Sequence, residues 1–170
     1  MKETTKSTTT EEKEEENKIE RSKFNVDKNT LKRTYDGIVF DSVLEMKFYR
    51  DVVLPKLESG EIQGYELQRP YILIEGFVHN GKKINPITYV ADFVLKYDGR
   101  EEVIDTKGMP DSVAILKRKL FYWKFPDVDY KWVCYSKIDG GWCDYEEVKK
   151  NRAARKRAKK KAAQETKSKE

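Results

Sequence analysis

The pattern of apolar and polar residues predicts an alternation of helices and strands between residues 41 and 135. Apolar residues recur every three or four positions in two segments, as on one face of a helix, and they alternate or cluster in four other segments, as in strands. The expected order is helix 41–57, strands 71–74, 87–97 and 101–107, helix 111–125 and strand 130–135. This order predicts an α/β fold with helices packed on a mixed β-sheet.

The second helix is expected to begin at a capping residue, Asp111 or Ser112, and to end before Pro126. Its apolar residues at helical spacing predict the side that faces the core. That side comprises Val113, Leu116, Leu120 and Trp123. Phe121 and Trp123 are interpreted as core residues rather than as platforms for stacked bases.

A central hairpin is predicted at Asp98-Gly99, because this pair between two apolar runs is a strong signal for a two-residue loop. Tyr97 then faces Arg100, and all facing pairs have position numbers that sum to 197. In this register, Asp92 faces Asp105 on the neighbouring strand.

Two facing carboxylates repel each other unless a cation or a shared proton relieves the repulsion. Lys107 lies two residues after Asp105 and should share its face of the sheet. A divalent metal beside a lysine suits the hydrolysis of a phosphodiester. An alternative interpretation is that Asp105 and Lys107 are ordinary solvated charges on an edge strand. That interpretation does not explain why Asp92 interrupts an apolar strand opposite another acid.

In the whole chain, 38% of the residues are charged, and these residues are concentrated at its two ends. Residues 1–30 contain few apolar residues and are predicted to be a disordered tail. Residues 149–170 carry a net charge of +9, and residues 31–148, the predicted domain, carry −3. The basic tail is expected to contact DNA through Arg152, Arg155, Lys156 and Arg157, or else to serve as a solubilising end.

Membrane segments and zinc sites are not expected. The chain has no apolar run of membrane-spanning length and no apolar stretch like that of a signal peptide. Its two cysteines, Cys134 and Cys143, are predicted to be reduced thiols, and His79 is the only histidine.

Four motifs occur in order between Tyr35 and Val133. They are Asp-Gly-Ile-Val-Phe-Asp-Ser-Val-Leu-Glu at 36–45, Thr-Tyr-Val-Ala-Asp-Phe at 88–93, Asp-Thr-Lys-Gly at 105–108 and Lys-Arg-Lys-Leu-Phe at 117–121. An aspartate on one strand followed by Asp-x-Lys on the next resembles the PD-(D/E)XK nuclease superfamily. The chain as a whole is similar to a small phage-encoded family within that superfamily, of poorly defined function.

The resemblance implies a restriction-endonuclease-like core and a Mg²⁺-dependent endodeoxyribonuclease, with Mn²⁺ able to substitute. It implies catalytic roles for Glu45, Asp92, Asp105 and Lys107, and metal ligands in Asp92, Asp105, the Thr106 carbonyl and Glu45. The expected partner is DNA, without a membrane or a small-molecule cofactor. Replication, recombination or packaging in the cytoplasm of a bacterial host is implied, with Holliday junctions among the substrates and a homodimer compatible with them.

Some of these assignments have alternatives. Glu45 follows Ser42 at the spacing of a capping box, in which it would only bond back to the helix start. The run Lys117, Arg118 and Lys119 either contacts phosphate or forms a solvated face. Gln68, expected just before the first strand, is a weaker candidate for a phosphate contact. The alternative function is a nucleic-acid-binding accessory protein that keeps the nuclease fold without catalysis.

Overall fold

The computed structural model of the protein describes residues 30–167, with side chains up to residue 164. The chain divides into two units, Met1–Val43 and Leu44–Glu170. In the first unit, the 3-10 turn η3 (Thr30–Arg33) leads into a short hairpin of β1 (Thr34–Tyr35) and β2 (Ile38–Val39). The predicted disordered tail over residues 1–30 lies outside the described residues except for its last position.

The second unit is built on a five-stranded sheet with the strand order β3-β6-β7-β8-β9. Its strands are β3 (Gly64–Ile74), β6 (Ile87–Tyr97), β7 (Arg100–Thr106), β8 (Asp129–Ser136) and β9 (Gly141–Asp144). The neighbours β7 and β8 run parallel, and the other neighbouring pairs run antiparallel. The predicted α/β fold with a mixed sheet is therefore confirmed.

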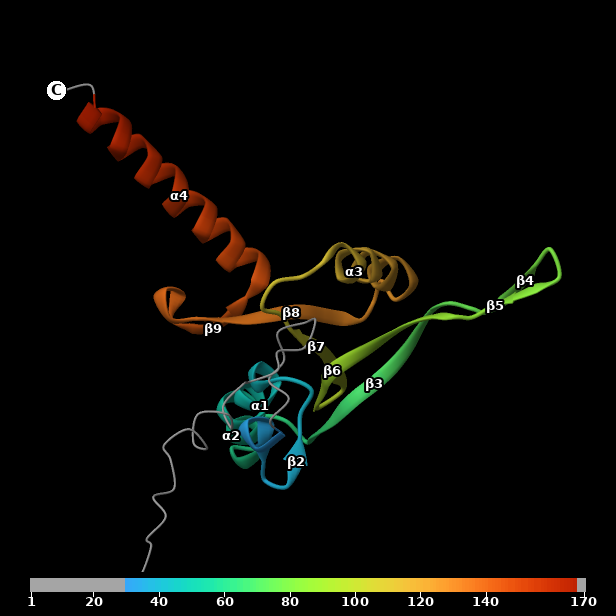
Figure 1. Cartoon of the computed structure of the whole chain (residues 1–170). Helices are drawn as coiled ribbons and strands as arrows, with labels where there is room; N and C mark the ends of the chain where they lie inside the picture. The colour runs from blue at the N-terminus through green and yellow to red at the C-terminus, as the bar shows by residue number, and fades with distance from the viewer. Residues whose placement is uncertain (1–29, 168–170) are drawn as a thin grey trace, which may run out of the picture. The chain divides into compact units, whose positions relative to one another are not determined.

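Helices cover both faces of this sheet (Figure 1). On one face lies α3 (Ser112–Lys124), which connects β7 to β8. On the other lie α1 (Val43–Phe48) and α2 (Leu54–Glu58), joined by the π-helical stretch η4 (Tyr49–Val53). The predicted helix 41–57 is thus one nearly continuous run from residue 43 to 58. Pro55 lies inside this run, at the start of α2, which directly follows the π-helical stretch.

The central hairpin has the predicted register. Tyr97 pairs with Arg100, and the pairing continues through Val94–Val103 to Phe93–Ile104, so that every pair sums to 197. Gly99 adopts a φ of 71°, in the left-handed region that glycine enters without steric cost. The bounds of β6 also agree with the prediction.

Several strands differ from the sequence interpretation. β3 begins at Gly64, well before Pro70, which is tolerated because β3 is an edge strand. A small hairpin of β4 (Phe77–His79) and β5 (Lys82–Ile84) lies between β3 and β6 in the chain. β9 was not predicted. It follows the 3-10 turn η5 (Lys137–Asp139) and Gly140, and it begins at Gly141; both glycines have a positive φ.

The predicted buried side of α3 is confirmed for Leu120 but is wrong for Val113, Leu116 and Trp123. Trp123 is 77% exposed, and Val113 and Leu116 are also exposed, whereas Phe121 is completely buried. Asp111 caps the helix by accepting a hydrogen bond from the Ala114 amide, as predicted. The side of α3 that packs on the sheet carries Ala114, Leu120, Phe121 and the neighbouring Phe125. The more exposed apolar stripe has equally good helical spacing, so periodicity alone favours neither side.

Phe121→Ala should destabilise the protein by about 3–5 kcal/mol, the usual cost of a large cavity in a packed core. The Phe121 ring lies 4.4 Å from the ring centre of Tyr130 and 5.0 Å from that of Tyr71. Trp123→Ala is the matched control on the same helix and should change the unfolding free energy by less than about 1 kcal/mol. Urea denaturation of both variants measures the difference, and equal losses would contradict the packing described here.

A carboxylate site at the end of the central hairpin

In β3 and β6, the alternation of side chains between the two faces of the sheet reverses at the same level. In β3, the Tyr65 ring packs on Tyr49 of η4, with ring centres 5.4 Å apart. The Tyr71 ring packs on Phe121 of α3, with ring centres 5.0 Å apart. Residues an even number of positions apart in a regular strand point to the same face, yet these two rings meet helices on opposite faces. The alternation of side chains therefore reverses between them.

The same reversal occurs in β6. The ring centre of Phe93 lies 5.1 Å from that of Phe48 of α1, and the ring centre of Tyr89 lies 5.4 Å from that of Phe121. Between the reversed halves lie Gln68 of β3 and Asp92 of β6, in facing positions between the regular pairs on either side. Gln68 has a φ of 53°, which is uncommon for a residue other than glycine. Such strain often marks a functional site, and here it lies beside a candidate catalytic residue.

Asp92 is held at the point where the central hairpin opens. Backbone pairing between β6 and β7 ends at Phe93–Ile104, one step before Asp92 and Asp105. The Thr106 amide and hydroxyl donate instead to the Asp92 carboxylate, at 2.7 and 2.9 Å, and both bonds are accepted by Oδ2. The predicted register is therefore confirmed as far as Phe93–Ile104, and Asp92 and Asp105 are not a backbone pair.

Asp105 is more deeply buried, with 2% of its surface exposed. Its Oδ2 forms an ion pair with Lys107 Nζ at 2.6 Å. Burial raises the pKa of Asp105, while Lys107 opposes the shift. The structure therefore brings the predicted pair Asp105 and Lys107 into direct contact.

The carboxylates of this site influence one another. Burial, together with the charges of Asp105 and Glu45, raises the pKa of Asp92 to about 8 despite the two hydrogen bonds from Thr106. Glu45, on α1, is 6% exposed, and its Oε2 accepts a hydrogen bond from Gln68 Nε2 at 3.4 Å. Gln68 lies within β3 rather than before the first strand, and its contact here is with Glu45.

Residues that the sequence interpretation missed also border this site. The hydroxyl of Tyr89 is buried without a hydrogen-bond partner, and burial and the charge of Asp105 raise its pKa. The Trp132 ring of β8 lies 5.5 Å from Lys107 Nζ and 4.3 Å from the Arg118 guanidinium. Trp132 is the register partner of Asp105 in the parallel pair of β7 and β8. The sequence does not indicate which strand lies next to β7, so this placement could not be predicted.

The predicted DNA-binding residues fall into two groups. Arg118 points inward from α3, and it donates to Tyr122 and forms an ion pair with Glu146 at 2.7 Å. Lys119 is exposed, and Lys117 is partly exposed. The first group therefore does not form one uniform cationic face.

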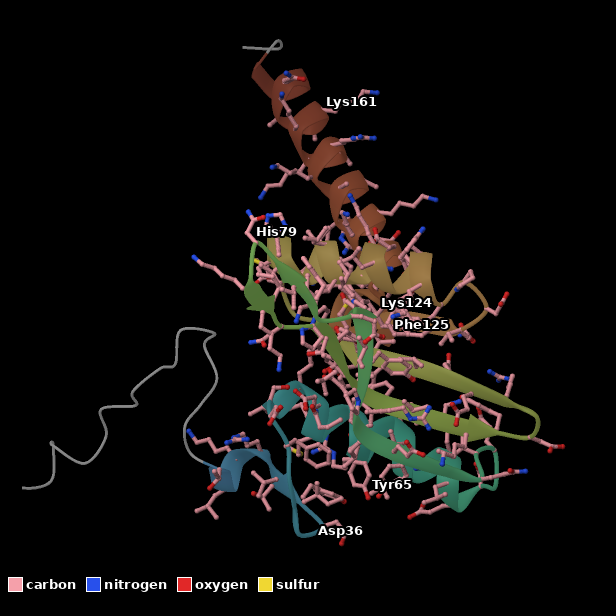
Figure 2. All side chains as sticks on the ribbon, turned by 90° about the vertical axis from the view of Figure 1, so that its right-hand side faces the viewer. Asp36, Tyr65, His79, Lys124, Phe125 and Lys161 are labelled. Carbon is pink, nitrogen blue, oxygen red and sulfur yellow. The ribbon has the colours of Figure 1, made fainter. Side chains whose placement is uncertain are left out.

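The second group lies on α4 (Tyr145–Lys167), a helix that includes most of the predicted basic tail. Arg152, Lys156 and Arg157 are exposed, and Figure 2 shows the side chains around Lys161 pointing outward on all sides of the helix. Arg155 instead donates to both oxygens of Asp139 at 2.7 and 3.0 Å, and these bonds hold the pKa of Asp139 well below its usual range. Arg155 therefore ties the helix to the sheet unit.

The acidic site contains carboxylate oxygens, the donors that hard divalent cations prefer, but no complete ligand cage among the described residues. In residues 30–167, no three carboxylate, imidazole or thiolate side chains are close enough together to bind a metal ion. Mg²⁺ is usually bound by one or two carboxylates with waters and substrate phosphate completing its shell. Asp92 and Asp105 are two carboxylates of this kind. The charge of Glu45 also acts on Asp92, and its Oε2 accepts the hydrogen bond from Gln68.

These observations define a mixed α/β protein with a buried carboxylate pair and a lysine at the end of its central hairpin. The model of one protein family, described as "Protein of unknown function (DUF1064)", matches residues 21–140. This match covers more than two thirds of the chain, so the protein belongs to that family. The match includes the whole carboxylate site and ends before α4. No curated protein matches the chain.

Proposed function

We propose that this protein is a PD-(D/E)XK-type, Mg²⁺-dependent endodeoxyribonuclease with a restriction-endonuclease-like core. The observation that carries this proposal is the arrangement of Asp105, Lys107 and Asp92. A buried carboxylate lies 2.6 Å from a lysine ammonium and close to a second carboxylate, whose pKa its charge raises. A structural ion pair has no need of the second acid, whereas phosphodiester hydrolysis uses all three groups.

Each residue has a role that its position allows. Asp92 and Asp105 would hold the cation, and Thr106 fixes the orientation of Asp92 through its amide and hydroxyl. Bound Mg²⁺ supplies an acidified water and neutralises charge on the phosphate. The Lys107 ammonium stabilises negative charge on the scissile phosphate. Glu45, oriented by Gln68, would accept a hydrogen bond from a water beside the site.

The basic helix α4 supplies the general attraction to DNA in this proposal. Its exposed lysines and arginines can neutralise phosphates and release their counterions, a term that does not depend on sequence. Among the described residues, no helix is long and apolar enough to cross a membrane. A phage-encoded enzyme that acts on DNA in the cytoplasm of a bacterial host is part of the same proposal, with Mn²⁺ able to replace Mg²⁺.

The direct test is an incubation of the full chain with supercoiled plasmid and with a four-way junction, in Mg²⁺ and in EDTA. We expect nicked or linear plasmid, or resolved junction, in Mg²⁺ and no product in EDTA, measured by gel electrophoresis. A catalytically inactive chain that binds DNA equally well with and without metal would contradict the nuclease proposal. That result would favour an accessory protein that binds DNA through α4.

A further inference from the structure

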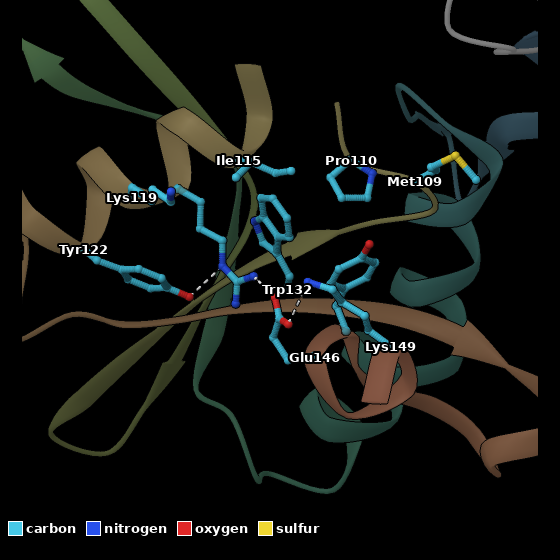
Figure 3. Close-up of a pocket in the computed structure, with 10 residues that line it drawn as sticks. Met109, Pro110, Ile115, Lys119, Tyr122, Trp132, Glu146 and Lys149 are labelled. Carbon is cyan, nitrogen blue, oxygen red and sulfur yellow. Dashed lines mark hydrogen bonds and ion pairs between the residues drawn. The ribbon is translucent and has the colours of Figure 1, made fainter. Parts of the chain in front are cut away.

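A pocket of about 470 Å³ lies beside the carboxylate site, between α3, β8, the start of α4 and the loop before α3 (Figure 3). One part of its wall is apolar, with Met109, Pro110 and Ile115. Another part is aromatic, with Tyr122 and Trp132. A volume in this range is typical of small-molecule and cofactor sites, and the lining suits a flat, largely apolar ring.

Cations surround the apolar wall. Arg118, Lys119 and Lys149 line the pocket together with a single acid, Glu146. Glu146 forms ion pairs with Arg118 at 2.7 Å and with Lys149 at 3.4 Å, so its charge is matched within the pocket. The balance of these four groups is positive. A ligand that combines a planar ring with a negative charge therefore complements both the wall and its rim.

The pocket and the carboxylate site share a boundary. Trp132 lines the pocket and is also the register partner of Asp105. Lys107, which contacts Asp105, lies 5.5 Å from the Trp132 ring centre, and Arg118 approaches that ring at 4.3 Å. A phosphate at Asp105 and Lys107 and a ring in the pocket would thus be neighbouring parts of one bound molecule.

We propose that this pocket receives the base of an unpaired nucleotide adjacent to the phosphate held at Asp92, Asp105 and Lys107. This inference rests on the proposed nuclease function and names its substrate class, which is DNA with single-stranded or branched segments. A base inside a duplex is stacked and paired, and it must leave the stack before a protein pocket can hold it. Aromatic walls with nearby cations are the usual means of binding single-stranded nucleic acid without a strict sequence preference.

The test fills the pocket without touching the carboxylates. Ile115→Trp places a large side chain at the pocket wall, from a position that is 43% exposed. Leu116→Trp is the matched control, because it adds a similar side chain to the next residue of α3, which is 55% exposed and does not line the pocket. The probe is a short single-stranded oligodeoxynucleotide containing 2-aminopurine, titrated in EDTA so that binding is measured without cleavage.

We expect Ile115→Trp to weaken binding of this probe about ten- to a hundredfold, the effect of losing one stacked base. Leu116→Trp should bind like the unaltered chain, and all three proteins should bind a duplex of the same sequence equally. Unchanged probe binding by Ile115→Trp would overturn the proposal, and so would an equal loss of duplex binding. If Ile115→Trp lowers the melting temperature, Ile115→Asp, which adds charge rather than bulk, takes its place with the same expectation.

Binding in EDTA separates this inference from the proposed activity. A chain that cuts no DNA in Mg²⁺ but loses probe binding through Ile115→Trp would refute the nuclease and retain the base pocket. A chain that cuts duplex and branched DNA equally well, with rates that Ile115→Trp does not change, would retain the nuclease and refute the pocket. Each result therefore bears on one proposal without confusing it with the other.

Discussion

Asp105→Asn should lower the rate of Mg²⁺-dependent DNA cleavage by about a thousandfold or more, because it removes the buried negative charge that faces Lys107. The amide keeps the size of the carboxylate, so the packing of β7 should survive. Lys107→Gln should have a similar effect, because a neutral amide cannot stabilise charge on the phosphate. Binding of duplex DNA in EDTA should stay close to that of the unaltered chain, since the exposed basic residues of α4 are untouched.

Glu101→Gln is the matched control for Asp105→Asn. Glu101 lies on the same strand, but its side chain is 46% exposed and its partner is Arg69 rather than Lys107. Exposed ion pairs contribute little, so this variant should cut DNA at close to the original rate. Single-turnover cleavage of a labelled substrate provides the measurement. Original rates for both Asp105→Asn and Lys107→Gln would remove the basis of the proposed catalytic site.

Metal-free protein should lose stability as the pH rises from about 4 to about 8, because of Asp92. Its pKa is raised to about 8 in the folded chain by burial and by the charges of Asp105 and Glu45, whereas an unfolded aspartate titrates near 4. The folded state therefore holds the proton more tightly than the unfolded state. The corresponding stability is fully present below pH ~4 and is lost as the pH passes ~8.

Asp92→Asn isolates this contribution from other groups that titrate. The amide oxygen can still accept the bonds from Thr106, but the position no longer acquires a charge. In EDTA, the variant should gain stability over the unaltered chain as the pH rises, with the gain levelling off above pH ~8 and reaching several kcal/mol. Urea midpoints at a series of pH values measure the difference. A difference that does not change with pH would contradict the raised pKa.

Added Mg²⁺ should reverse this order at pH 8. A cation that binds only the folded state stabilises it, and Asp92→Asn removes one of its two proposed carboxylate ligands. The unaltered chain should therefore show a higher urea midpoint in Mg²⁺ than in EDTA, and the variant should not.

Local signals in the sequence were sufficient for the central hairpin and for the ends of α3. Asp98-Gly99 determines both the turn and the pairing of its strands, because each step along an antiparallel pair follows from the loop. The proximity of Asp105 and Lys107 followed from their spacing of two on one strand. These features depend on residues close together in the chain, which is why they could be predicted.

Features that depend on distant contacts could not be predicted. The buried side of α3 includes Arg118, whose charge is accommodated only because Glu146 and the Trp132 ring lie beside it. No pattern within α3 indicates these partners, and the more apolar stripe containing Trp123 was the natural but wrong choice. Tyr89 likewise has the periodicity of an ordinary core residue, and its hydroxyl meets the acidic site only through the arrangement of the sheet.

Gln68, whose backbone φ is in the left-handed region, couples changes at the carboxylate site to changes in the core during evolution. If both strands became regular at this level, half of each would rotate by one position, and Tyr71 and Tyr89 would leave the aromatic cluster under α3. Under the proposed function, a lineage could lose catalysis by changing Asp92 or Lys107 alone, but it could not make these strands regular without replacing two hydrophobic layers together. Descendants without activity should therefore keep the reversed side-chain alternation of β3 and β6 after the acidic residues of the site have been replaced.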